Sequence, residues 1–86
     1  MASVDDVRNG VAQAKAKADE ALGSLEQARA SLDDAQNMLT QAIQGSGHDE
    51  ILQARNMLAE AGQNLNLLKS SISNSIETAD GWAGRL

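Results

Sequence analysis

Cysteine, proline, phenylalanine and tyrosine are absent from this sequence of 86 residues, and Trp82 is its only aromatic residue. The lack of cysteine excludes disulfide bonds and leaves the redox environment of the protein open. A small globular core usually depends on aromatic side chains, disulfides or a bound metal, so we do not expect a compact globule. The abundant residues, chiefly alanine, leucine, glutamine and the acids, favour helices that pack on other helices.

Positive charge is also scarce. The formal net charge is −5, and the 7 lysines and arginines are scattered along the chain without forming a patch. Nucleic-acid-binding proteins need a basic face that displaces counterions, and anionic membranes attract basic helices, so we predict neither partner. No segment approaches the roughly 20 apolar residues that span a bilayer, and we therefore expect no membrane insertion.

The beginning of the sequence carries no recognisable export signal. Residues 1–6 are acidic and lack an apolar run, so we predict no secretory signal peptide. The expected location is the cytoplasm, or the outside of the cell if a signal-peptide-independent route exports the folded helices.

Strong helix-breaking signals occur only near the middle of the chain, at residues 45–48. Gly45 suits the left-handed position that ends a helix, and Ser46 suits the cap of the next one. At the chain start, Ser3 precedes an acid three residues later in the same way. We predict one helix over about residues 4–44, a turn at 45–48, a second helix over about 49–80 and a frayed tail at 81–86.

Apolar residues recur with heptad spacing in both predicted helices, which is typical of a coiled coil. The first core series contains Val4, Val11, Ala18, Leu25, Leu32 and Leu39, followed by Ile51, Leu58, Leu65, Ile72 and Ala79. The second core series contains Val7, Ala14, Ala21, Ala28, Ala35 and Ala42, followed by Ala54, Ala61, Leu68, Ser75 and Trp82. The predicted fold class is therefore all-α, an antiparallel two-helix hairpin.

The two series fit each other when the chain folds at the central turn and residues whose numbers add to 93 are paired. Leu65 then faces Ala28, Leu58 faces Ala35, and a large side chain meets a small one in nearly every layer. This matching favours self-pairing within one hairpin over a continuous rod.

Two helices alone bury little surface compared with the entropy lost when about 75 residues become ordered. Several apolar residues also fall outside the two core series or at the open end of the hairpin. We expect dimerisation into a four-helix bundle, as a homodimer or as a heterodimer with another helical hairpin. The candidate partner-binding residues are Val4, Val7, Leu22, Met38, Ile43, Leu52, Met57, Leu67, Ile76 and Trp82.

Groups for catalysis or metal binding are not assembled by any motif. His48 is the only histidine, and one histidine beside two adjacent carboxylates is too few ligands for a closed zinc site. Adjacent acids such as Asp33 and Asp34 point about 100° apart on a helix, so they cannot act on one substrate. We predict no enzymatic activity, no cofactor and no bound metal.

Three residues have two possible interpretations. Gly23 and Gly62 interrupt good helices, and each marks either a close helix contact or a tolerated surface position. Trp82 occupies a core position near Val11 and Gly10. It serves either as a staple that closes the open end of the hairpin or as an anchor for a partner, since tryptophan is enriched at interface hot spots.

This architecture resembles the small helical hairpins of the WXG type, the ESX-like proteins of bacterial type VII secretion. The resemblance implies an acidic, all-helical protein that pairs as a four-helix homo- or heterodimer. The turn residues Gly45, Ser46, Gly47, His48 and Glu50 also resemble those of uncharacterised actinobacterial hairpins, some of which stand ahead of polymorphic toxin domains.

The resemblance covers the whole chain as architecture but departs from the family in its motifs. The Trp-x-Gly of the family lies in the turn, whereas Trp82-Ala83-Gly84 lies at the far end here. The family's tail signal contains a tyrosine, which this sequence lacks. We predict a non-enzymatic helical interaction protein with a role in type VII secretion, as substrate, partner or targeting module for a secreted toxin. The alternative is a structural or adaptor coiled coil with no secretion role.

Overall fold

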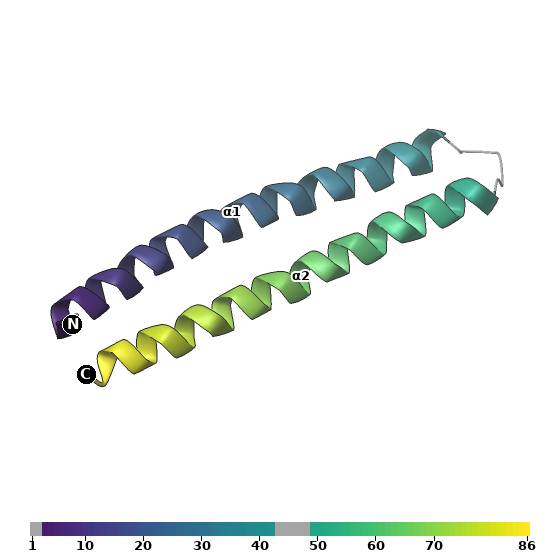
Figure 1. Cartoon of the computed structure of the whole chain (residues 1–86). Coiled ribbons are helices and arrows are strands. Elements are labelled where there is room, and N and C mark those ends of the chain that lie inside the picture. The colour runs from purple at the N-terminus through teal and green to yellow at the C-terminus, as the bar shows by residue number, and fades with distance from the viewer. Residues whose placement is uncertain (1–2, 43–48) are drawn as a thin grey trace.

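A computed structural model describes residues 3–42 and 49–86, which form two long helices lying side by side in antiparallel directions (Figure 1). Helix α1 spans Val4–Ala42 and helix α2 spans Asp49–Gly84. The hairpin measures 65 × 17 × 15 Å. The predicted all-helical hairpin is confirmed. The predicted turn at 45–48 and the end of the first helix at residues 43–44 lie outside the described residues.

The start of α1 is held by a reciprocal cap. The backbone N–H of Asp6 donates to Ser3 Oγ at 3.1 Å, and the backbone N–H of Ser3 donates to Asp6 Oδ2 at 3.3 Å. Two backbone donors that the first turn leaves unpaired are satisfied in this way. The carboxylate of Asp6 also lies at the positive end of the helix dipole. The cap predicted from Ser3 and its downstream acid is therefore confirmed.

The end of α2 differs from the prediction, because the helix continues four residues beyond residue 80 to Gly84. Packing against α1 explains the extension. Ala83 is only 5% exposed, and Arg8 Nε donates to its carbonyl oxygen at 3.5 Å. The backbone N–H of Arg85 then closes the last turn on the carbonyl of Trp82 at 3.1 Å. Tertiary contact thus overrides the helix-weakening effect of Gly81.

The first core series lies along the line where the two helices meet, which we call the seam. Its members are half-buried in both helices, with the exception of Val4, which is 46% exposed at the open end. The half-buried members are Val11, Ala18, Leu25, Leu32, Leu39, Ile51, Leu58, Leu65, Ile72 and Ala79. The prediction for this series is therefore confirmed apart from Val4.

The second core series is largely wrong. Seven of its members are exposed, namely Ala14, Ala21, Ala28, Ala42, Leu68, Ser75 and Trp82. The other four, Val7, Ala35, Ala54 and Ala61, are half-buried like the first series. The seam instead uses the residues four positions after the first series. These residues include Leu22, Arg29, Gln36, Arg55, Gly62, Lys69, Ile76 and Ala83, all of them half-buried or buried. One of the two stripes is therefore displaced by one residue, about 100° around the helix, and the centre of the seam shifts by about 50° toward that flank.

A contact between Arg29 and Gly62 shows why the seam takes this side. The guanidinium of Arg29 donates to the carbonyl oxygen of Gly62 at 2.8 Å and also to Asp33 Oδ1 at 3.3 Å. A Cβ added to Gly62 would lie 3.3 Å from the guanidinium carbon. Gly62 therefore marks a close contact, whereas a Cβ added to Gly23 would meet open space.

The register agrees with the predicted sum of 93 on average. The residue numbers of Arg29 with Gly62, and of Arg8 with Ala83, add to 91. Those of the ion pairs Lys69–Glu26 and Lys15–Asp80 add to 95. The two helices are therefore paired at the level that the sequence predicts, although different side chains form the second half of each layer.

We expect Gly62→Leu to lower the free energy of unfolding by about 1–3 kcal/mol, because the new side chain would displace the Arg29 guanidinium from the seam. The matched variant Gly23→Leu should raise it by up to about 1 kcal/mol through helix propensity alone. Urea unfolding followed by circular dichroism measures both. Equal shifts in the two variants would show that Gly62 does not lie against α1.

Candidate interaction surface

Five of the 7 basic residues share one heptad position, at one edge of the seam. They are Arg8, Lys15, Arg29, Arg55 and Lys69. Their spacing of seven or a multiple of seven within each helix is visible in the sequence, but we predicted a scattered distribution. The structure corrects that prediction, since a stripe of cations follows this edge.

Interhelical ion pairs identify this side of the hairpin as its polar face. Lys69 Nζ lies 3.3 Å from Glu26 Oε1, and Lys15 Nζ lies 3.8 Å from Asp80 Oδ2. Both acids stand one residue after a member of the first core series, one on each helix. Pairs this exposed contribute little stability, typically about 0–1 kcal/mol each. Their value here is that they show which flanks of α1 and α2 lie on the same side.

The opposite side of the hairpin is lined by the second core series, which we call the apolar face. The ion pairs place Glu26 of α1 and Asp80 of α2 on the same side of the seam. In each helix the second core series lies on the other side of the first series, so the two second-series stripes share the opposite face of the hairpin. Its apolar members are Val7, Ala14, Ala21, Ala28, Ala35, Ala42, Ala54, Ala61, Leu68 and Trp82. Ser75 is the polar member, and no member is charged.

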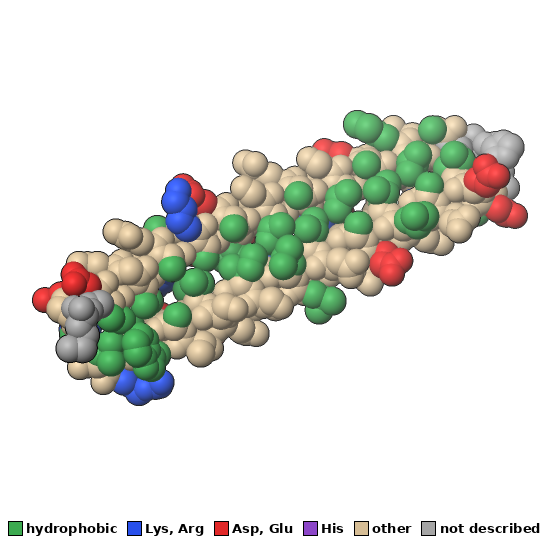
Figure 2. All heavy atoms as spheres, viewed as in Figure 1, with side chains coloured by type: hydrophobic (Ala, Val, Ile, Leu, Met, Phe, Trp, Pro, Cys, Tyr) green, Lys and Arg blue, Asp and Glu red, His purple; other side chains and the backbone are tan. Residues whose placement is uncertain are grey.

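Figure 2 shows a side of the hairpin on which hydrophobic side chains form a band along the junction of the two helices, with charged side chains at the edges and ends. Leu68 is 47% exposed and Trp82 is 49% exposed. Among the described residues, only Gly62 and Ala83 are buried. The hairpin therefore leaves several large apolar side chains in contact with water.

The candidate partner-binding residues fall into three groups. Exposed members are Val4, Met38, Met57, Leu67 and Trp82. Half-buried members are Val7, Leu22, Leu52 and Ile76. Leu22 and Ile76 were expected outside the seam, but the rotation of the seam places them in it. Ile43 lies outside the described residues.

Met38 and Met57 flank the apolar face along its two outer rims. Both stand three residues after a member of the second core series, Met38 after Ala35 and Met57 after Ala54. They are 67% and 64% exposed. Leu67, at 68% exposure, precedes Leu68 and points about 100° away from the apolar face. Two adjacent leucines of α2 therefore lie on different sides of the hairpin.

At the open end the sequence predicts Trp82 in the seam, but Ala83 takes that position. Ala83 occupies the seam, while the indole of Trp82 stays half-exposed on the apolar face. Helix α2 extends almost to the start of α1 at this end, since Ala83 reaches the level of Arg8. About half of Trp82 is therefore covered by the hairpin, and the other half is open to solvent on the apolar face.

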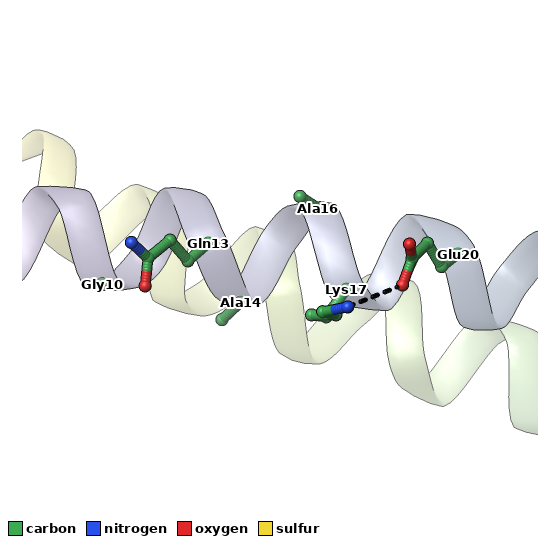
Figure 3. A pocket seen from close by; sticks show the side chains of 6 residues that line it. All are labelled: Gly10, Gln13, Ala14, Ala16, Lys17 and Glu20. Atoms are coloured by element: carbon green, nitrogen blue, oxygen red, sulfur yellow. Dashed lines mark hydrogen bonds and ion pairs between the residues drawn. The ribbon is translucent and has the colours of Figure 1, made fainter.

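A shallow hollow, open to solvent, lies on α1 along one rim of the apolar face, and Figure 3 labels the residues that line it. Its lining residues are Gly10, Gln13, Ala14, Ala16, Lys17 and Glu20. Lys17 Nζ pairs with Glu20 Oε2 at 3.2 Å along it, and a Cβ added to Gly10 would meet no atom within 4 Å. The missing side chain of Gly10 thus leaves space for a side chain from elsewhere.

Within residues 3–42 and 49–86, no group of three histidine, cysteine or acidic side chains is arranged to hold a metal. Neither α1 nor α2 is long and apolar enough to cross a membrane. His48 lies outside the described residues. The hydrophobic side chains on the apolar face and its rims are therefore the features on which a functional argument rests.

Comparisons with family models, curated proteins and solved structures find no match for this chain.

We expect Trp82→Ala to change the free energy of unfolding of the dilute hairpin by less than about 1 kcal/mol, because the indole is half-exposed. The neighbouring Ala83→Leu should lower it by about 1–3 kcal/mol, since a larger side chain does not fit between α2 and Arg8. Thermal unfolding by circular dichroism compares the two. A larger loss for Trp82→Ala than for Ala83→Leu would restore Trp82 to the seam.

Proposed function

We propose that this chain is a non-enzymatic helical interaction protein whose apolar face packs against the helices of a partner hairpin, forming a four-helix bundle. The observation that supports this most directly is the uncharged apolar face opposite the ion-paired polar face. An amphipathic surface of this kind on a two-helix hairpin is completed when a second pair of helices covers it.

The thinness of the seam supports the proposal energetically. Ordering one backbone residue costs about 1–2 kcal/mol, and here 75 helical residues must be ordered. The half-buried side chains of the seam are the main compensation that the hairpin itself provides. Covering the apolar face would remove further alanine, leucine and tryptophan surface from water, at about 25 cal/mol per Å² of apolar area.

The chemistry of the face favours a helical partner. Alanines at seven-residue intervals let two helices approach closely, because their short side chains keep the backbones near each other. Leu68 and Trp82 supply larger groups that can insert between such helices, and tryptophan is a frequent interface anchor. The methionines at the two rims add flexible apolar side chains that adapt to a neighbouring surface.

A role in type VII secretion is a more specific prediction that rests on the resemblance of the sequence to WXG-type hairpins. The hairpin architecture is compatible with a secretion role. It is equally compatible with the alternative, a structural or adaptor coiled coil. Secretion of the tagged chain by a host with an intact type VII system, and its loss when the system's ATPase is deleted, would favour the secretion role. Equal amounts in both culture filtrates would favour the adaptor.

We expect Leu68→Glu to abolish association with the partner and Leu67→Glu to preserve it. The two leucines are adjacent and both exposed, but only Leu68 lies on the apolar face, where a buried carboxylate would be costly. Cross-linking in the native host followed by mass spectrometry should recover a helical protein, either this chain or another, with wild type and Leu67→Glu only. Recovery of the same proteins by both variants would exclude the apolar face as the binding surface.

A further inference from the structure

Resting on the proposed function, we propose that the partner is a second copy of this chain. The two hairpins pack through their apolar faces with their turns at opposite ends, so that α1 lies on α1 and α2 on α2. Their two-fold axis crosses α1 near Ser24 and α2 near Leu67 and Leu68. Features on α1 and on α2 place this axis independently of each other.

The first feature is the charge at the two ends of α2. Glu50 lies on the outer rim of the apolar face in the first turn of α2, and Arg85 follows 35 residues later, one residue beyond the end of the helix at Gly84. When two copies of α2 run antiparallel, Glu50 of each copy reaches Arg85 of the other if the axis passes midway between them. That midpoint lies between Leu67 and Leu68.

The apolar residues of α2 suit the same axis. Leu68 then lies beside its own symmetry mate at the centre, so its 47% exposed side chain is covered by a second leucine. Trp82 of one copy reaches the level of Ala54 of the other. A large side chain meets a small one there, and the half-exposed indole gains a neighbour without a clash.

The hairpin register transfers this axis from α2 to α1. The ion pair between Lys69 and Glu26, with 3.3 Å between Nζ and Oε1, holds those two residues side by side. The numbers of the four interhelical contact pairs add to 91 or 95, with a mean of 93, so Leu68 lies at about the level of Leu25. The axis derived from the charges of α2 then crosses α1 between Leu25 and Glu26.

The second feature, on α1, gives a position within about two residues of this one. Met38 is a 67% exposed side chain on the rim, and the hollow at Gly10, Ala14 and Lys17 is a vacant space on the same rim. Figure 3 labels the residues of the hollow along one stretch of α1. If Met38 of one copy fills the hollow of the other at Gly10, the axis lies midway between these residues, at Ser24.

The size and charge of the contact suit a second copy. The hairpin measures 65 by 17 Å across its broad side, so two copies would cover roughly 1,000 Å² each, near the roughly 800 Å² per partner of stable complexes. The net charge of −5 on each copy does not oppose contact at the apolar face, because that face carries no charged residue. The acids lie on the polar face and at the edges.

Single-cysteine variants test the axis, since the natural chain has no cysteine. Ser24 lies on the axis at the rim, so Ser24→Cys should form a disulfide-linked dimer upon mild oxidation. Ser31, also an exposed serine of the same rim one heptad further, lies roughly 21 Å from its symmetry mate. Ser31→Cys should therefore stay uncross-linked, as non-reducing gel electrophoresis would show, while light scattering reports a dimer for both variants under reducing conditions.

Three results would overturn the inference. A dimer in which Ser24→Cys does not cross-link, or in which Ser31→Cys cross-links equally, has a different axis. With turns at the same end, α1 would lie on α2 and the two Ser24 residues would be diagonal, so neither variant would cross-link. A monomer by light scattering throughout the micromolar range excludes a second copy. In that case the proposed function still stands if Leu68→Glu removes a different helical protein in the native host.

Discussion

The whole hairpin depends on one narrow line of contact between two helices. The seam is built from half-buried leucine, isoleucine and alanine side chains, and among the described residues only Gly62 and Ala83 are buried. A chain without disulfides and with a single aromatic residue has few other means to order 75 helical residues. The same limitation that makes the seam thin leaves an entire apolar face in water, and that face is the basis of the functional proposal.

Polar contacts between the helices follow the flank of each helix that enters the seam. The guanidinium of Arg29 reaches over α2 to the carbonyl of Gly62, and that of Arg8 reaches the carbonyl of Ala83. Each long side chain lies against a residue with little or no side chain. Exposed ion pairs then follow on the same side, so that the polar groups of the hairpin concentrate on one face and the alanines remain on the other.

Much of the fold follows from the sequence alone, because its signals are local and strong. Heptad spacing predicts the helices, the first core series and the average register, and Ser3 with Asp6 predicts the cap of α1. The second half of the seam was mispredicted because two stripes flank the first series. The stripe that contains Ala28 is more apolar and is therefore the better candidate for the seam by sequence. The stripe that contains Arg29 is the one that packs between the two helices.

The contacts that distinguish the stripe in the seam from the exposed stripe join residues far apart in the sequence. Arg29 and Gly62 are 33 residues apart, and the value of a glycine at position 62 becomes visible only when a guanidinium lies over it. The seven-residue spacing of the basic residues was the one signal in the sequence that indicated a common edge. Trp82 was misplaced for the same reason, since its neighbour Ala83 continues the stripe of Gly62 and Lys69. A search for long cations facing small residues would have found the seam.

The central claim is that the hairpin is completed by a second copy of itself at its apolar face. Its most direct test is the melting temperature of the unmodified chain over a range of protein concentrations, followed by circular dichroism. If the dimer is the stable species, the melting temperature rises steadily with concentration, because mass action favours the associated state. A cooperative transition whose midpoint is the same at every concentration would show that the two-helix seam is sufficient, and would contradict the account.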